Sequence, residues 1–431
     1  MMSSDYFFES LNGSFLFSFS SIFVVLLVLS GCSSEGVQHE IADDVPMDLE
    51  YPLSVSEVAW EWQAPDGGGW LLSKPIPVGV AVFYGDGVTV LAGDSGEELW
   101  AYRVPGSEIL GNVSDDQRFV VLTLANEGED NVEMLILDSG TGKILHRYNL
   151  SEISRSVVGE GSSNYHLRSA LSSVTESAWF TADQSGEVTA REFSTDEKLW
   201  SVEVTANCPQ DESVDDIFAW DKVILLAVTC FPGTEAKSGV SADFVSALIG
   251  IDPSDGVELW REEVFFSDHP ESSFDREFTA RHDGMVLARY SHFDSGQVID
   301  AFKGESLITD GREIPIWVSD DGSEIGLWDR RVENYWIKDH DGRIKRQLNG
   351  RGESVVRPIL ADPGIGLRQG ILLTDRVFLE DGELALFEGF DHSVSIPSDR
   401  VVAWSSGHLA PGSVVVTYNS NNDERFAVGL R

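Results

Sequence analysis

The sequence predicts an all-β chain folded as a propeller of eight four-stranded antiparallel blades, with seven blades as the alternative. From about residue 56, short runs rich in Val, Ile, Leu, Phe, Trp and Tyr alternate with clusters of Gly, Asp, Ser and Asn. This alternation is typical of many short strands joined by turns. No stretch of this region keeps the 3.6-residue apolar period of an amphipathic helix. A turn-and-strand unit also recurs at intervals of about 40–60 residues, the spacing of propeller blades.

The recurring unit is a turn followed by the start of a strand. "LDSGTGKILH" at 137–146 contains Asp138 and Gly142, and "IDPSDGVELW" at 251–260 contains Asp252, Gly256 and Trp260. The other copies supply Gly96, Trp100, Trp200, Asp300 and Gly304, and two weaker copies centre on Gly342 and Gly382. Agreement in both spacing and residue type identifies these segments as repeats of one structural unit.

Each residue type in the unit has a structural role. An Asp at the end of one strand can accept hydrogen bonds from backbone N–H groups across the turn, and the Gly can adopt the positive φ of a tight hairpin. The Leu-Trp pair opens the next strand, where a large aromatic ring can be buried between neighbouring sheets. We therefore expect these residues to build the fold.

The unit resembles the repeat of pyrroloquinoline-quinone (PQQ) type β-propellers, whose blades share the pattern L-D-x-x-T-G-x-x-L-W. Residues 137–146 match it at every position except the last, and the resemblance extends over roughly residues 56–431. In quinoprotein dehydrogenases of this fold, a vicinal disulfide, a stacking Trp and a calcium-ligated Asp surround the cofactor. This sequence has no adjacent cysteine pair, so the resemblance implies the architecture, and we expect no quinone, metal or other cofactor.

The two ends of the repeat region are incomplete in complementary ways. Residues 57–65, "EVAWEWQAP", form a Trp-rich strand with no inner strands before it, and the last repeat, 413–431, stops without an outer strand. Pairing the N-terminal strand with the last blade would complete the ring and remove two free sheet edges. Seven internal turns and this closing blade give the count of eight.

Residues 1–31 resemble a bacterial lipoprotein signal peptide. The apolar run ends in Leu29-Ser30-Gly31-Cys32, which is similar to a lipobox and makes Cys32 the expected lipidation site. No Lys or Arg precedes it, unlike an ordinary export signal, so an uncleaved anchor is the alternative. We expect residues 32–55 to be a flexible acidic tether and residues 56–431 the propeller domain. The protein would then face outside the cytoplasm, attached to the cell membrane by its lipid alone.

Cys208 and Cys230 remain in an oxidising compartment, where two leftover cysteines usually form a disulfide. Cys208 follows the outer strand of one predicted blade, and Cys230 opens an insertion at 231–243. We expect their bridge to link adjacent blades. The sequence has no CxxC pair and no Cys/His cluster with zinc spacing, so a metal role for these residues is not expected.

One string suggests catalysis. "GDSG" at 93–96 resembles the nucleophile loop of trypsin-like proteases, with Ser95 as the nucleophile. Such an enzyme needs a His base, and the only His before Ser95 is His39, in the predicted tether. Asp–His pairs such as 339–341, and the polar loop at 419–424, fit turn residues better than metal ligands. We expect no catalytic residue.

The charge balance limits the possible partners. Asp and Glu number 72 against 30 Lys and Arg, a formal net charge of -42. This charge repels phosphate backbones, so we expect no nucleic-acid binding. We expect a monomeric, non-catalytic binding or scaffold module whose propeller face contacts a protein or another cell-envelope component. The outer-membrane assembly lipoprotein of similar build is an analogy of fold. The alternatives are a quinone- or metal-dependent oxidoreductase using the central channel, and a sensor of extracellular ligands.

Overall fold

The computed structural model describes most of the chain from residue 36 onward. The described residues are 36–43, 45, 49–53, 57–65, 71–125, 132–149, 173–182, 186–204, 212–230, 244–266, 276–281, 283–290, 295–308, 313–319, 323–329, 334–339, 341–349, 365–366, 371–373, 383–388, 393–397, 403–419 and 424–431. Within them, 32 strands form eight sheets. In the same residues, no helix is long and apolar enough to cross a membrane.

Seven of the sheets are built from strands that follow one another along the chain. The first holds β3 (Leu71–Ile76), β4 (Gly79–Tyr84), β5 (Gly87–Ala92) and β6 (Glu98–Arg103), and the second β7 (Glu108–Val113), β8 (Phe119–Ala125), β9 (Val132–Asp138) and β10 (Ile144–Asn149). The third holds β11 (Ala178–Ala182), β12 (Glu187–Glu192) and β13 (Lys198–Glu203). The fourth holds β14 (Glu212–Trp220), β15 (Val223–Cys230), β16 (Phe244–Ile251) and β17 (Glu258–Phe266).

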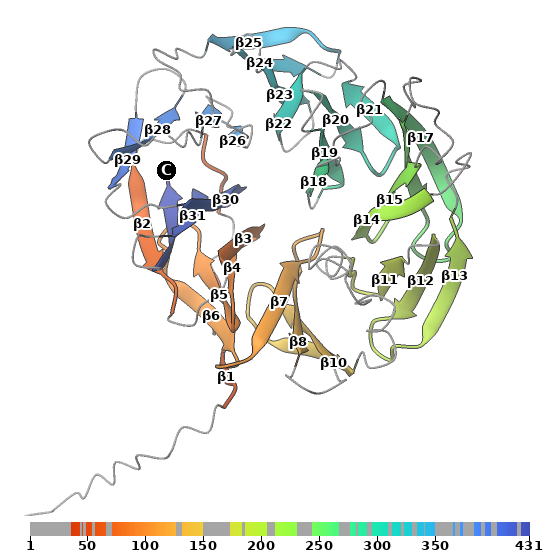
Figure 1. The fold of residues 1–431 in the computed structure, drawn as a ribbon, viewed down its shortest axis with the longest axis horizontal. Helices are drawn as coiled ribbons and strands as arrows, with labels where there is room; N and C mark the ends of the chain where they lie inside the picture. The colour runs from red at the N-terminus through yellow and green to blue at the C-terminus, as the bar shows by residue number, and fades with distance from the viewer. Residues whose placement is uncertain are drawn as a thin grey trace, which may run out of the picture. The chain divides into compact units, whose positions relative to one another are not determined.

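The next three sheets repeat the same order. The fifth holds β18 (Arg276–Ala280), β19 (Met285–Tyr290), β20 (Ser295–Asp300) and β21 (Glu305–Ile308). The sixth holds β22 (Ile314–Val318), β23 (Glu324–Asp329), β24 (Asn334–Asp339) and β25 (Ile344–Asn349). The seventh holds β26 (Ile365–Gly366), β27 (Ile371–Leu373), β28 (Glu383–Glu388) and β29 (Ser393–Pro397). Figure 1 shows the first strands of the blades near the centre of the ring and the last strands, such as β17 and β25, at its rim.

The eighth sheet closes the ring as the sequence predicts. It joins β2 (Val58–Gln63) to β32 (Arg425–Leu430), followed by β31 (Ser413–Asn419) and β30 (Ala403–Ala410). Beyond the paired strands, the backbone N–H of Glu57 donates to the carbonyl of Arg431 at 2.8 Å, and the reverse bond is 3.0 Å long. The all-β propeller of mainly four-stranded antiparallel blades is therefore confirmed, with seven consecutive blades and one closing blade.

The first blade differs from the expected four strands. Strand β1 (Gln38–Glu40) pairs antiparallel with β6 and makes this sheet five-stranded. The pairing lies inside the segment 32–55 that the composition predicts to be a flexible tether. An outer strand presents a row of unpaired N–H and C=O groups that any extended segment can pair with. Because this pairing uses the backbone, the polar side chains of the segment gave no sign of it.

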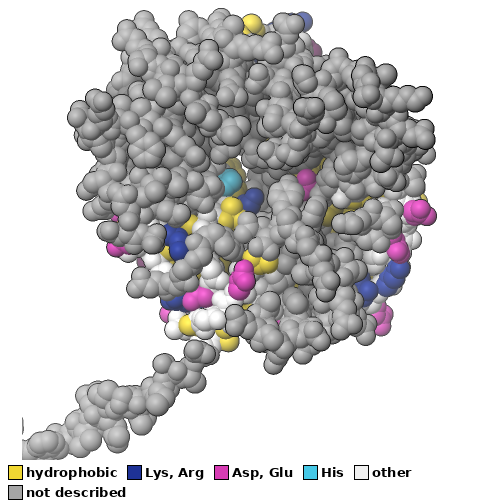
Figure 2. Space-filling view, in the orientation of Figure 1, with side chains coloured by type: hydrophobic (Ala, Val, Ile, Leu, Met, Phe, Trp, Pro, Cys, Tyr) yellow, Lys and Arg dark blue, Asp and Glu magenta, His cyan; other side chains and the backbone are white. Residues whose placement is uncertain are grey.

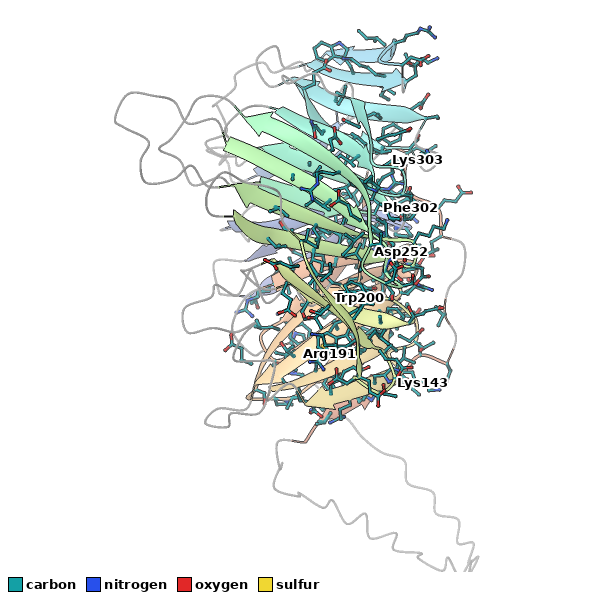
Figure 3. All side chains as sticks on the ribbon, turned by 90° about the vertical axis from the view of Figure 1, so that its right-hand side faces the viewer. Lys143, Arg191, Trp200, Asp252, Phe302 and Lys303 are labelled. Carbon is teal, nitrogen blue, oxygen red and sulfur yellow. The ribbon has the colours of Figure 1, made fainter. Side chains whose placement is uncertain are left out.

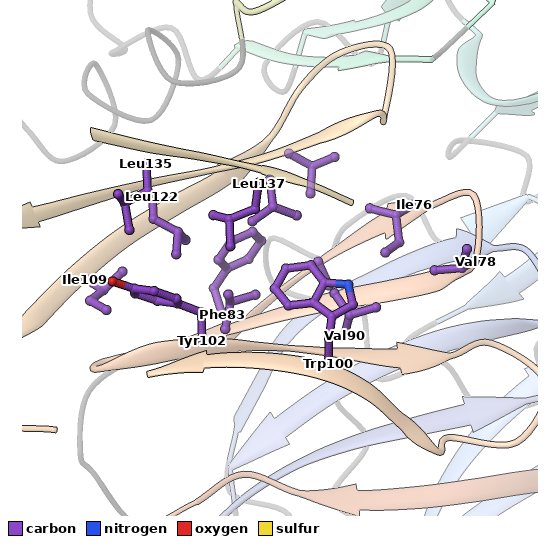
Figure 4. Packing of buried hydrophobic residues seen from close by; sticks show 14 of the residues in the cluster. Ile76, Val78, Phe83, Val90, Trp100, Tyr102, Ile109, Leu122, Leu135 and Leu137 are labelled. Atoms are coloured by element: carbon purple, nitrogen blue, oxygen red, sulfur yellow. The ribbon is translucent and has the colours of Figure 1, made fainter. Parts of the chain in front are cut away.

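The hydrophobic core lies between neighbouring blades. Strands β4 and β5 are buried along their whole length, because each has a blade packed on either face. Figure 4 shows one such layer, in which side chains of the first and second blades interdigitate. Its labelled members are Ile76, Val78, Phe83, Val90, Trp100, Tyr102, Ile109, Leu122, Leu135 and Leu137. The first and second blades therefore stabilise each other through this layer.

The two faces of the ring differ in their connections. In an antiparallel blade, the turn between the first and second strands and the turn between the third and fourth strands lie on one face, which we call the short-turn face. Figure 3 shows the turn residues Lys143, Asp252, Phe302 and Lys303 together on that side. Several connections of the other face lie outside the described residues, including 126–131, 150–172, 205–211, 231–243 and 267–275.

Candidate functional site

On the short-turn face, four outer-strand tryptophans each bind the turn of the next blade. The indole Nε1 donates to a backbone carbonyl in every case. The bonds are Trp60 to Gly93 at 2.8 Å, Trp100 to Ser139 at 2.9 Å, Trp200 to Pro253 at 3.0 Å and Trp260 to Ala301 at 3.0 Å. Each ring thus contributes buried apolar area and one directional bond to the same blade contact.

The turn glycines complete these contacts. Gly96, Gly142, Gly256 and Gly304 have φ values of 70°, 73°, 76° and 67°, a region that residues with a Cβ rarely adopt. A Cβ there would lie 2.6 Å from Trp60, 2.5 Å from Trp100, 2.9 Å from Trp200 and 2.3 Å from Trp260, respectively. The glycines are therefore required twice, for the backbone conformation and for the space that the indole occupies.

The acidic residues of the repeat hold the same turns. Oδ1 of Asp138 accepts from the backbone N–H of Thr141 at 2.8 Å and from its hydroxyl at 2.7 Å. Asp252 receives the equivalent bonds from Ser254, and these hydrogen bonds hold the pKa of Asp252 below its usual value. Oδ1 of Asp300 accepts from the N–H of Phe302 at 3.0 Å. All three carboxylates shape turns that receive a tryptophan or precede an outer strand.

The contact between the second and third blades departs from this pattern at both partners. His146 stands in the tryptophan position, and Asp196 stands in the glycine position with φ of 61°. The His146 ring lies edge-on to Phe193, with ring centroids 4.2 Å apart. Burial lowers the pKa of His146 and raises that of Asp196. A smaller ring therefore accompanies the larger turn residue, and the two substitutions compensate in volume.

Nearer the centre, a buried carboxylate links the second blade to the fourth. Asp115 lies in the turn between β7 and β8, and its Oδ2 accepts the backbone N–H of Ala219 in β14 at 2.7 Å. Burial raises the pKa of Asp115 well above its usual value, and the nearby Asp116 adds to the rise, whereas the Ala219 bond opposes it. Ser173 reinforces the link between the third and fourth blades by donating its hydroxyl to the carbonyl of Ile217 at 2.9 Å.

Arg118, in the same turn, reaches carboxylates from three blades. Its guanidinium lies 2.7 Å from Asp116, 2.6 Å from Glu176 and 2.9 Å from Asp221. Glu176 precedes β11 and Asp221 follows β14. Because Glu176 and Asp221 are exposed, we assign these ion pairs a modest stabilising role. This turn carries no repeat motif, and we did not expect these contacts; its one signal in the sequence is a polar run, "SDDQR" at 114–118, between two strongly apolar strands.

The residues considered for catalysis are occupied by structural contacts. Ser95 lies in the turn before β6, where its Oγ accepts the N–H of Glu97 at 3.4 Å. His39 lies in β1, and its Nε2 donates to the carbonyl of Gly142 at 2.8 Å. Among the described residues, no group of three or more His, Cys, Asp or Glu side chains could hold a metal ion. Figure 2 shows described hydrophobic, basic, acidic and His side chains around a hollow near the ring centre.

Several predicted residues lie outside what the structure describes. Cys32 and Cys208 are not among the described residues, and Cys230 ends β15 with its side chain not described. Gly382 is also outside them, whereas Gly342 is described, with φ of 76° and no described atom within 4 Å of a Cβ built there. The lipidation and disulfide predictions therefore stay predictions.

Residues 56–223, less than half of the chain, match the family model described as outer membrane protein assembly factor BamB. The chain is similar to the PQQ-like β-propeller proteins. The matched residues run from the closing strand β2 to the start of β15, so they include the Trp60 and Trp100 contacts. No curated protein sequence matches the chain.

Two solved structures resemble this chain at low identity. The crystal structure of BamB from Moraxella catarrhalis aligns with a TM-score of 0.46 and 14% identity, covering 87% of this chain and 100% of that one. Dihydro-heme d1 dehydrogenase NirN in complex with DHE aligns with a TM-score of 0.36 and 14% identity, covering 88% and 80%. At these scores neither alignment carries an argument about function.

Proposed function

We propose that this chain is a lipid-anchored scaffold that binds protein partners during outer-membrane protein assembly. The observation that carries the proposal is the match of residues 56–223 to the family of outer membrane protein assembly factors. The eight sheets support it, because a closed ring of blades presents a rigid surface with many turns. A propeller fold alone would leave the function open.

We assign partner contact to the outer rim of the third and fourth blades on the short-turn face, defined by Leu199, Val257 and Leu259. Leu199 is 51% exposed and Leu259 is 49% exposed, although both belong to the strongly apolar Leu-Trp repeat. Exposed apolar side chains beside carboxylates such as Glu197 and Glu258 suit a partner with an apolar centre and basic edges. In the first blade, by contrast, the outer strand β6 is already paired by β1.

The test is complementation in the native host after deletion of the gene. We expect the deletion to lower the content of outer-membrane β-barrel proteins, and the wild-type chain to restore it. A Leu199→Asp, Leu259→Asp double variant should be folded by circular dichroism but fail to restore that content. Ile344→Asp is the matched control, because Ile344 is 56% exposed at the start of β25 in the sixth blade. Unchanged β-barrel content in the deletion strain would contradict the assembly role.

The anchor is tested separately. With Cys32→Ser we expect a chain that no longer incorporates labelled fatty acid and that keeps residues 1–31, whereas the wild-type chain takes up the label and begins at Cys32. A Cys208→Ser variant should retain the lipid and serves as the thiol control. A wild-type chain that takes up no label and keeps residues 1–31 would show that this segment holds the chain without lipidation.

A further inference from the structure

The N-terminal segment is fixed to the propeller from the start of β1. Strand β1 pairs with β6 in the register Gln38 to Arg103, His39 to Tyr102 and Glu40 to Ala101. The His39 ring lies edge-on to Tyr102 with centroids 5.3 Å apart, and its Nε2 binds the carbonyl of Gly142 in the second blade. This segment therefore bridges two blades at the rim of the ring.

The residues after β1 are fixed as well. The N–H of Ala42 donates to the carbonyl of Thr141 at 3.0 Å, and Val45 packs against the core between the first two blades. Further along, the carbonyl of Glu50 accepts the N–H of Gly412, in the turn of the closing blade, at 2.8 Å. Strand pairing, hydrogen bonds and apolar packing thus attach the chain to the propeller at several points between residues 38 and 50. The composition predicts this segment to be a flexible tether.

Because β1 is paired with the propeller, only a short piece of chain connects a lipid at Cys32 to the folded body. Five residue steps separate Cys32 from Val37, and a fully extended chain spans at most about 17 Å over that length. A free tether over 32–55 would extend to about 80 Å by the same arithmetic. A compact body of the size of residues 37–431 is about 55 Å across. A lipid at Cys32 can therefore reach the membrane from one side of the propeller only.

We propose that the bilayer surface lies against the rim of the first two blades, beside β1, in the lipid-anchored protein. This inference rests on the proposed lipidation of Cys32. Val37, immediately before β1, and Ile41, immediately after it, are 57% and 56% exposed, so two apolar side chains face outward where the short connection begins. Apolar side chains on such a surface can enter the headgroup region of a bilayer.

Charge does not explain this orientation, because the formal net charge of -42 repels anionic headgroups. The short connection and the two apolar side chains determine it instead. The fifth and sixth blades, on the far side of the ring in Figure 1, then face away from the bilayer. The outer rim of the third and fourth blades stays free for a protein partner.

The experiment measures the distance of two turns from the lipid surface. A fluorescent amino acid replaces Lys143, in the second blade, or Lys303, in the fifth; Figure 3 shows both on the short-turn face. The lipidated full-length protein is reconstituted into phosphatidylcholine vesicles that carry an energy acceptor on their headgroups. We expect at least threefold more efficient energy transfer from position 143 than from position 303. Equal efficiencies in a lipidated, vesicle-bound protein would overturn the orientation.

Three further variants separate orientation from attachment. Inserting 20 Gly/Ser residues between Gly36 and Val37 should bring the two efficiencies to within 1.5-fold while the protein stays bound to the vesicles. His39→Ala, which removes the bond to Gly142, should lower the ratio, whereas Gln38→Ala, an exposed residue paired through its backbone, should not. If the wild-type chain is not lipidated, the anchor in the proposed function fails and the orientation proposal falls with it.

Discussion

A methyl group on Gly142 would lie 2.5 Å from Cδ2 of Trp100, the ring that the preceding blade places against this turn. The same relationship joins Gly96 to Trp60 and Gly304 to Trp260. At these contacts one blade carries the tryptophan, and the next blade carries the glycine that leaves space for it. The most regular residues of the sequence repeat therefore form contacts between blades.

This relationship predicts how strongly the turn glycines resist substitution. Gly142→Ala should lower the free energy of unfolding by about 2–5 kcal/mol, because it combines a strained positive φ with overpacking against Trp100. Gly342→Ala is the control, since its φ of 76° is similar but no described atom lies within 4 Å of its Cβ. Gly342→Ala should lower the free energy of unfolding by about 1–2 kcal/mol, which is the cost of the backbone strain alone. Urea unfolding curves measure both, and equal losses would show that the indole contact has no energetic role.

The contact between the second and third blades predicts a coupled pair of substitutions. His146→Trp alone should destabilise the protein, because Asp196 occupies the space that a glycine leaves for an indole elsewhere. Combined with Asp196→Gly, the tryptophan can bind as Trp100 does, and the double variant should be more stable than the sum of the singles predicts. We expect a coupling energy of about 1–3 kcal/mol from a double-mutant cycle. Additive effects would contradict the volume compensation.

Asp115 predicts a pH dependence of stability with a defined sign. Its pKa is raised in the folded state, mainly by burial, so the folded protein takes up a proton at a higher pH than the unfolded chain. The free energy of unfolding should therefore rise as the pH falls through the folded pKa, until the unfolded carboxyl also protonates.

The test of Asp115 is a comparison of variants from pH 8 to pH 4.5. Asp115→Asn should be more stable relative to wild type at pH 8 than at pH 4.5, because it removes the buried ionisation. Asp255→Asn, at an exposed turn position in the fourth blade, controls for the relief of general acidic repulsion at low pH. A constant difference between wild type and Asp115→Asn across this range would show that Asp115 titrates normally.

The predicted disulfide between Cys208 and Cys230 would make a measurable contribution to the free energy of unfolding. A bond between Cys208 and Cys230 would close a loop of about 22 residues and stabilise the fold by about 3 kcal/mol in the chain-entropy description. Peptide mapping of the exported protein without reduction should recover the two cysteines in one linked fragment. Cys208→Ser and Cys230→Ser should lower the unfolding free energy equally, whereas unequal losses or two free thiols would rule out the pair.

Much of the fold follows from the sequence because its repeat is made of residues with narrow structural roles. Gly96, Gly142, Gly256 and Gly304 mark turns that need positive φ, and the tryptophans that follow two of them mark outer strands. The Trp-rich segment at 57–65 predicted the closing sheet, because a strand without inner partners must find them elsewhere. In contrast, Asp115 and Arg118 carry no repeat pattern, and their contacts with the third and fourth blades depend on distances between strands far apart in sequence.

The all-β class, the repeat, the ring closure and the acidic composition follow from the sequence, since these depend on local patterns and residue content. The blade that each tryptophan binds, and the packing of the His146 ring against Phe193, became known from the three-dimensional arrangement. It also decided that residues 38–40 form a strand on the first blade. The physical reason is that backbone pairing at an open edge needs an extended segment of any composition, placed there by the fold. The proposed orientation at the membrane depends on this one pairing.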